Sequence, residues 1–463
     1  MAANPPPVRP PQNRGRGRPT TRESAGASLG AVLNLIRSGQ ATTRQELERE
    51  SELGRAVVAD RVATLADIGL IAESELGPAT GGRAPRLLQF RKDLGCMLTA
   101  TLDHSEIGVG IANLSGELFA EHHEAHDAGA DARSMSQRIL TLFDWMIAKH
   151  APAMPVWGIG VSVPGPVVDG GDLPFMARTP SFLPAWDDIP LLELLFDRFA
   201  APVWLRSSIE TMTMGERFAG AGKALDSMLF VKVGQRIEAG LVCEGRLYRG
   251  AQGAAGLIGQ MPVQAGDRGS TLDALAGSDM IASEGLAAAK SGKSPILGET
   301  LRRSGDVGAV DVSQAAQSGD PASIEILARS GRLVGRSVAM LANMLNPRLI
   351  VLSGTMAQTN DLLLAAVREI VYGESHPLVT RDLVIAKSQM GSSAGLVGAA
   401  MVVVESLFDP ACLKDWVILG TPLAHPKFLS LRTSCKSLLA DFAARQDQPD
   451  GAPEIASATR YSP

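Results

Sequence analysis

The chain has 463 residues, of which 45% are hydrophobic and 20% charged, and its formal net charge is −5. This length indicates more than one domain, and this composition excludes a wholly disordered or collagen-like chain. The longest apolar run, Ala394 to Val404, is shorter than the roughly 18 to 20 residues that cross a bilayer. We therefore expect no membrane partner. The Pro- and Arg-rich N-terminus does not resemble a secretory signal, so we expect a cytoplasmic protein with reduced cysteines.

Residues 1–24 are predicted to form a disordered basic tail, because they combine Pro and Arg with almost no residue that can join a core. Within the tail, Arg14, Arg16 and Arg18 alternate with glycine before Pro19. This pattern resembles an AT-hook, in which an extended backbone places arginines in a narrow minor groove of DNA. A solvated low-complexity tail is the alternative interpretation.

Residues 25–90 have the pattern of a winged helix-turn-helix DNA-binding domain. Apolar side chains recur at helical spacing from Leu29, and Thr43 with Glu46 forms a capping-box signature. Gly69 is placed to end the third helix in the left-handed conformation. The three helices are expected at about residues 28–36, 43–50 and 55–68.

Two short strands at residues 70–74 and 87–90, joined by a loop at 77–86, are predicted to form the wing. Arginines on the second and third helices and in the wing are the predicted DNA contacts of this domain. They are Arg44, Arg55, Arg61, Arg83 and Arg86. A purely structural helical bundle is the alternative.

Residues 91–408 alternate strands with helices, which predicts an α/β domain. The expected strands are 97–102, 107–113, 158–163, 228–233, 240–243 and 349–352, and the clearest helices are 135–150, 191–199 and 324–345. Residues 409–463 are predicted to be an irregular, partly disordered C-terminal extension with one helix near 434–444.

Several phrases resemble those of the ROK family (repressor, open reading frame, kinase). They are Gly69-Leu70-Ile71, Thr80-Gly81-Gly82-Arg83-Ala84-Pro85, Gly158-Ile159-Gly160-Val161 with Pro164-Gly165-Pro166, Leu183-Pro184-Ala185-Trp186, Gly245 to Gly250 with Gly256, and Asn346 to Leu352. The resemblance covers about residues 28–408. It implies a two-lobed actin-like domain of the sugar-kinase type that holds its ligand between the lobes. Members of the family are sugar kinases or sugar-sensing transcription factors.

The chemical groups of a ROK kinase are replaced in this sequence. Where the family has the aspartate base of an Asn-Asp pair, Ser207 and Ser208 stand here, and Glu210 lies two positions away. The two glycine-rich phosphate turns correspond to residues 101–106 and 234–238, and most of their glycines are replaced. We therefore expect no catalytic residues, no ATP cofactor and no enzyme activity.

The sugar and zinc residues implied by the resemblance are replaced as well. Phe182 stands for an asparagine, and Leu257 and Gln260 stand for the Glu and His of the Glu-x-Gly-His motif. Residues 266–273 replace the cysteine-rich zinc loop, so no metal is expected there. Phe182, Ser207, Ser208, Leu257 and Gln260 would line a degenerate ligand pocket. His122 to Asp127 could offer metal donors, but an edge strand with polar residues is the preferred interpretation.

The sequence thus predicts a regulator, most simply a repressor, that binds double-stranded DNA as a homodimer or a higher homo-oligomer. Its actin-like domain would serve dimerisation and possible sensing of an unknown effector. A sugar kinase with an appended DNA-binding domain and a scaffold protein without ligand are the alternatives.

Overall fold

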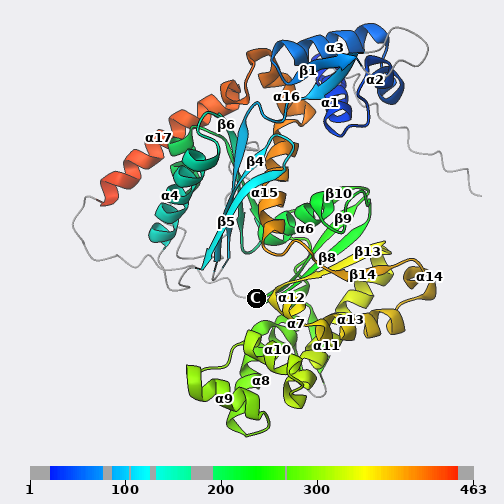
Figure 1. Ribbon diagram of the computed structural model, residues 1–463, viewed down its shortest axis with the longest axis vertical. Helices are drawn as coiled ribbons and strands as arrows, with labels where there is room; N and C mark the ends of the chain where they lie inside the picture. The colour runs from blue at the N-terminus through cyan, green and yellow to red at the C-terminus, as the bar shows by residue number, and fades with distance from the viewer. Residues whose placement is uncertain are drawn as a thin grey trace, which may run out of the picture. The chain divides into compact units, whose positions relative to one another are not determined.

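The protein is described from a computed structural model that covers residues 21–76, 86–103, 106–125, 132–167, 191–265 and 268–446 (Figure 1). The chain divides into two compact units. The N-terminal unit extends to Arg91 and also contains Ser406–Pro426. The main unit contains Lys92–Glu405 and the chain from Lys427 onward.

The N-terminal unit has the three helices and two-stranded wing that the sequence predicts. They are α1 (Thr21–Arg37), α2 (Arg44–Ser51), α3 (Arg55–Asp67), β1 (Ile71–Leu76) and β2 (Arg86–Phe90), with β1 antiparallel to β2. The capping box at α2 is confirmed, because the Glu46 N–H donates to Thr43 Oγ1 and the Thr43 N–H donates to the Glu46 carboxylate. Gly69 follows α3 with a φ of +75°, as predicted.

A C-terminal segment completes this unit. Helix α16 (Pro410–Trp416) packs on α1, where Gly26 and Gly30 leave room for Pro410. Phe408 meets Phe90 edge to face, with ring centroids 5.8 Å apart. The prediction that the chain becomes irregular beyond Asp409 is wrong, because α16 and α17 (Pro426–Gln446) are regular helices. Asp409 caps α16 and a proline occupies its first turn, which together form a helix start signal.

The first sheet of the main unit has the strand order β5-β4-β3-β6-β7. The strands are β3 (Cys96–Leu102), β4 (Glu106–Asn113), β5 (Leu118–Ala125), β6 (Val156–Val163) and β7 (Val203–Ser207). β3, β4 and β5 are antiparallel neighbours, while β6 and β7 extend the sheet in parallel. The helices of this lobe are α4 (Ala132–His150), α5 (Leu191–Phe199), α6 (Ser208–Ala219) and α15 (Ser393–Leu407).

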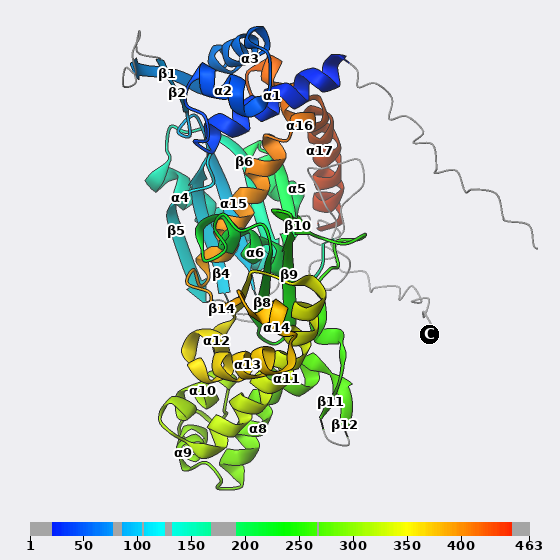
Figure 2. The ribbon, with the colours of Figure 1, turned by 90° about the vertical axis from the view of Figure 1, so that its right-hand side faces the viewer.

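The second sheet repeats this topology with the order β10-β9-β8-β13-β14. Its strands are β8 (Met228–Val233), β9 (Ile237–Cys243), β10 (Arg246–Tyr248), β13 (Leu349–Ser353) and β14 (Val384–Lys387). A separate pair is formed by β11 (Pro262–Ala265) and β12 (Arg268–Thr271). In Figure 2 most helices of this lobe lie in the lower part of the picture, below the strands of the second sheet. They are α7 (Leu272–Ala276), α8 (Ser278–Lys290), α9 (Pro295–Ser304), α10 (Ala309–Gln317), α11 (Pro321–Leu345), α12 (Thr355–Thr359), α13 (Asp361–Glu374) and α14 (Pro377–Thr380).

The duplicated sheets confirm the predicted two-lobed α/β architecture, and every strand predicted for this domain is present. Helix α6 comes directly after β7 and packs against β9 of the second sheet. Within the described parts of the chain, no single helix is long and apolar enough to cross a membrane, although α15 and the helical stretch after it pass that test as a pair bent by 65°.

Candidate nucleic-acid interface and interlobe cleft

Helix α3 presents an exposed face with little base-reading chemistry. Val58, Val62 and Leu65 are fully buried in the core of the N-terminal unit. The opposite face of the helix exposes Arg55, Ala56, Val57, Ala59 and Asp60. Arg55 is in the first turn, the part of a recognition helix that contacts base edges in helix-turn-helix proteins. It is the side chain of α3 best placed to donate to a base or phosphate.

Arg61 has partners inside the unit. Its Nε donates to the Ser28 hydroxyl over 2.9 Å, and its Nη1 donates to the Asp60 carboxylate over 2.7 Å. Only 23% of its side chain is exposed. Arg61 therefore ties α3 to α1, a structural role that the sequence pattern does not indicate for this predicted DNA contact.

Arg44 and Arg86 meet at one carboxylate. Arg44 at the start of α2 and Arg86 at the start of β2 both donate to Glu73 of β1, over 2.7 and 2.9 Å. Both guanidinium groups remain more than half exposed. Glu73 thus keeps two arginines predicted to contact DNA close together beside the wing. Two arginines and one glutamate leave this group with a net positive charge. Arg14, Arg16, Arg18 and Arg83 lie outside the described residues.

The segment that corresponds to the family's Asn-Asp pair forms the start of helix α6. Ser207 caps α6, and its N–H donates to the Glu210 carboxylate over 3.1 Å. Glu210 is only 6% exposed and also forms an ion pair with Arg249, whose Nη2 donates to the Val167 carbonyl over 3.2 Å. Ser208 follows as the first residue of α6 and is 7% exposed. Glu210 is therefore committed to a cap and an ion pair, so it has no free oxygen placed to take a proton from a sugar hydroxyl.

The segments that correspond to the family's phosphate turns are held by charged side chains of the chain itself. Lys232 Nζ donates to Asp103 over 3.1 Å, joining the end of β3 to β8. Asp273 accepts from the backbone N–H of Ile237 over 2.7 Å and from Gln260 Nε2 over 2.9 Å. Asp103 lies in one of the segments that the sequence resemblance assigns to a phosphate turn, and Asp273 contacts the other, where a kinase would need donors and glycines.

Glu238 is a third carboxylate near Asp103 and Asp273. It is 6% exposed and lies directly across from Lys232 in the β8–β9 pair. Burial raises the pKa of Glu238, Lys232 and Arg236 act to lower it, and Asp273 and Asp103 raise it further. A buried acid of this kind would repel a phosphate once it is ionised.

The other predicted pocket residues do not build a hexose site. Leu257 has 36% of its surface exposed and brings no polar group, and Gln260 is committed to Asp273. Phe182 lies outside the described residues. Sequence reasoning missed Arg249, since nothing in a short motif shows that its partner lies 39 positions away.

Metal donors are scattered in the described parts of the chain, where no three His, Cys, Asp or Glu side chains form a group able to hold a metal. His122 Nε2 lies 3.3 Å from Glu124, but that carboxylate also accepts from Arg138. Both residues are on β5, the edge strand expected there, and His126 is outside the described residues.

The duplicated sheets define an actin-like fold of the sugar-kinase type, and the chain also carries a winged helix. The chain belongs to the ROK family, whose sequence profile matches residues 104–406. It is similar to the xylose repressor of Caldicellulosiruptor bescii, with 25% identity over 82% of this chain and 96% of that protein. It is also similar to the DNA-binding transcriptional repressor Mlc of Escherichia coli, with 24% identity over 81% of this chain and 92% of that protein.

Solved structures show the same fold. A ROK family transcriptional regulator described as a homologue of the E. coli Mlc protein matches with a TM-score of 0.70 and 21% identity, over 86% of this chain and all of the other. A ROK family glucokinase from Streptomyces griseus, in complex with glucose and AMPPNP, matches with a TM-score of 0.54 and 21% identity, over 66% of this chain and 99% of the other. The fold is thus common to regulators and kinases, and the site residues have to distinguish them.

Proposed function

We propose that this protein is a DNA-binding transcriptional repressor whose ROK domain has no kinase activity. The observation that carries the proposal is the combination of the three helices and two strands of a winged helix with a ROK domain in which Ser208 stands in place of the base and Glu210 is held by Arg249. The repressors among its relatives, which align with most of this chain, support the same conclusion. The protein would act on double-stranded DNA in the cytoplasm.

The DNA contacts proposed in the described parts of the chain are Arg55 on α3 and the pair Arg44 and Arg86 beside Glu73. Arg61 is a weaker candidate because Ser28 and Asp60 hold it. Arg83 of the wing loop and the tail arginines Arg14, Arg16 and Arg18 complete the proposed interface. Phosphate contacts would position the unit, and Arg55 would add contact to a base edge.

A gel-shift titration of Arg55→Ala at fixed salt tests this placement. The bound site is first identified by genome-wide mapping and footprinting. We expect about tenfold or greater loss of affinity, corresponding to about 1–3 kcal/mol for a good base contact. Arg302→Ala is the matched control, since it removes the same charge from an exposed helix of the main unit. An unchanged midpoint for Arg55→Ala would contradict the assignment of α3 as the recognition helix.

Kinase activity is the competing function, and the glucokinase likeness in fold is the observation that favours it. Negative charge disfavours it, because Asp103, Glu238 and Asp273 lie in or contact the segments that the sequence resemblance assigns to the phosphate turns. A coupled assay with ATP and a panel of hexoses is expected to show no turnover, and calorimetry is expected to show no binding of ATP. Phosphorylation of any hexose that Ser208→Ala abolishes would overturn the proposal.

A further inference from the structure

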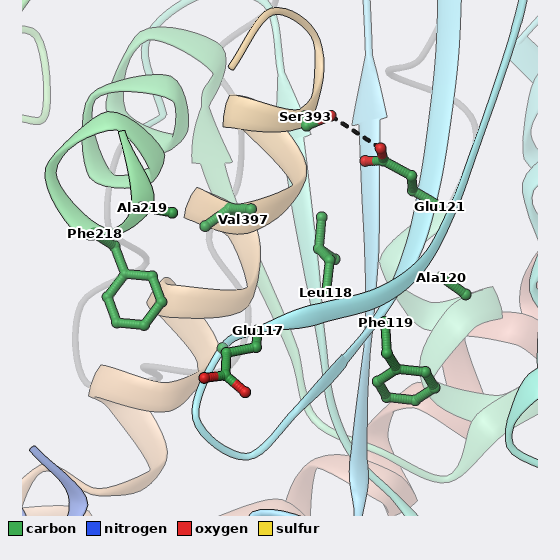
Figure 3. A pocket seen from close by; sticks show the side chains of 10 residues that line it. Glu117, Leu118, Phe119, Ala120, Glu121, Phe218, Ala219, Ser393 and Val397 are labelled. Carbon is green, nitrogen blue, oxygen red and sulfur yellow. Dashed lines mark hydrogen bonds between the residues drawn. The ribbon is translucent and has the colours of Figure 1, made fainter. Parts of the chain in front are cut away.

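A pocket of about 490 Å³ lies in the first lobe of the main unit, and none of the cleft residues described above lines it (Figure 3). Its walls come from the turn between β4 and β5, the end of α6 and the start of α15. The lining residues are Gly116, Glu117, Leu118, Phe119, Ala120, Glu121, Phe218, Ala219, Ser393 and Val397. Neither the proposed DNA contacts nor the remnants of the sugar site use this pocket.

The lining combines apolar side chains with negative charge. Leu118, Phe218 and Val397 supply apolar surface, while Glu117 and Glu121 are the ionisable groups among the described residues that line it. Figure 3 shows Glu121 with Ser393 at one end of the pocket and Phe218 with Glu117 at the other. A ligand that matches this lining needs an apolar body and a positive charge.

The two carboxylates differ in how far their charge is compensated. Glu117 accepts from Lys92 Nζ over 2.6 Å and from Asn113 over 2.9 Å, and the bond from Lys92 lowers its pKa. Glu121 accepts one hydrogen bond, 3.1 Å from the Ser393 hydroxyl. Its other oxygen lies 3.7 Å from His123 Nε2, beyond hydrogen-bonding distance.

His123 is also engaged elsewhere, because its Nδ1 lies 2.8 Å from Glu106. Glu121 therefore retains acceptor capacity at the mouth of an apolar pocket, and 41% of its side chain is exposed. An ammonium group has three donors and no acceptor, so it complements this carboxylate. A charge-assisted bond of this kind is about twice as strong as a neutral one.

We propose that this pocket binds a small organic amine, with its ammonium group on Glu121 and its aryl or alkyl body against Leu118, Phe218 and Val397. An anion would be repelled by Glu121, whereas Lys92 compensates the charge of Glu117. A neutral molecule of the same shape would keep the apolar contacts without the charged one. The inference concerns the main unit alone and stands whether or not the chain binds DNA.

Isothermal titration calorimetry of the full chain tests this with phenethylamine, 2-phenylethanol and phenylacetate. We expect saturable binding of phenethylamine, at least about tenfold weaker binding of the alcohol, and no binding of the acid. Equal affinity for amine and alcohol would overturn the charge assignment. Absence of saturable phenethylamine binding at millimolar concentration would overturn the site.

Two variants locate the binding. Glu121→Gln keeps an oxygen that accepts from Ser393 and removes the charge, so phenethylamine affinity should fall about tenfold or more. Glu124→Gln is the matched control, because Glu124 is on the same strand, is paired with Arg138 and does not line the pocket. Ala219→Trp fills the pocket from an exposed position and should abolish binding. Unchanged binding in both Glu121→Gln and Ala219→Trp would show that the amine binds elsewhere.

Discussion

The buried carboxyl of Glu238 on β9 should make the stability of the main unit depend on pH. Burial raises the pKa of Glu238 above its ordinary value of 4.5. A raised pKa means that the folded state holds this proton more tightly than the unfolded state, so stability falls as pH rises from about the unfolded pKa through the raised folded value. The loss of stability caused by burying the ionised carboxylate is complete above the folded-state pKa.

Glu238→Gln removes this penalty, so it should raise the melting temperature of the main unit near neutral pH and change it little at pH 4. Differential scanning calorimetry over this range measures the difference between the two proteins. Glu299→Gln is the control, because Glu299 is exposed on α9 and pairs with Arg302. A pH-independent difference for Glu238→Gln would mean that packing, rather than ionisation, determines the effect.

At the level of single residues, the sequence showed which kinase residues are missing. It did not show which interactions the replacing residues make. Missing glycines and a missing aspartate are visible within short motifs. By contrast, Arg249 reaches Glu210, and Lys232 reaches Asp103 across 129 positions. These pairs depend on how the two lobes fold, so no local pattern could predict them.

At the level of elements, α16 belongs to the N-terminal unit although it lies more than 300 residues after it. A Cβ on Gly30 would come within 2.7 Å of Pro410 Cγ, and one on Gly26 within 2.9 Å of the Pro410 carbonyl oxygen. The helices therefore approach so closely that a side chain at either glycine has no room. Trp416, fully buried, donates from its indole to the Leu407 carbonyl and fixes the far end of this segment.

Gly30→Val should push α16 away from α1 and destabilise the N-terminal unit by about 1–3 kcal/mol through overpacking. Hydrogen exchange should then become faster in α1 and α16, with the main-unit helices unchanged. Ala27→Val is the control, because it puts the same side chain on the exposed face of α1. Equal protection of α16 in Gly30→Val and the parent protein would contradict this packing role.

Regular elements with a strong local pattern were predicted to within a few residues, including α2, α3, β8 and α11. The helix predicted near 434–444 lies within α17, which begins earlier, at Pro426. Helix α16 was missed because it is short and begins at Asp409-Pro410. That dipeptide is also typical of turns. Here the dipeptide begins a helix that is packed against α1, a contact that the local sequence does not show.

At the level of the whole molecule, the proposed homo-oligomer needs a surface. Met340 and Met344 of α11 are 53% and 82% exposed, and Leu378 of α14 is 68% exposed. A groove of about 730 Å³ lies beside the end of α11, lined by Leu378 and Val379 and by polar side chains such as Asn343, which is next to Met344 in the sequence. Exposed apolar side chains often mark interaction surfaces.

Met344→Glu should therefore convert the proposed dimer to monomer at micromolar concentration and weaken operator binding. Light scattering after size exclusion gives the mass directly. Leu429→Glu, at a 48% exposed leucine of α17, is the matched control and should leave the mass unchanged. A dimer that persists in Met344→Glu would exclude this face as the interface.

We expect the affinity of the whole chain for DNA to be divided between the winged helix and the N-terminal tail. The exposed face of α3 offers Ala56, Val57, Ala59 and Asp60 beside Arg55, so it supplies few base contacts. Affinity must then come from phosphate and minor-groove contacts, and the tail arginines are the densest positive charge in the chain. Deleting residues 1–20, which end just before α1, should weaken binding and reduce preference for A·T-rich flanks. The log–log salt slope should flatten by about 0.9 for each phosphate that the tail no longer neutralises.

Changing Arg14, Arg16 and Arg18 together to lysine separates charge from shape. Lysine keeps the charge, so the salt slope should stay close to that of the parent protein. The flank preference should nevertheless fall, because it depends on arginines inserted in the narrow minor groove. If the deletion changes neither affinity, slope nor flank preference in gel shifts across a salt series, the tail does not touch DNA. The winged helix and its arginines would then account for all of the binding.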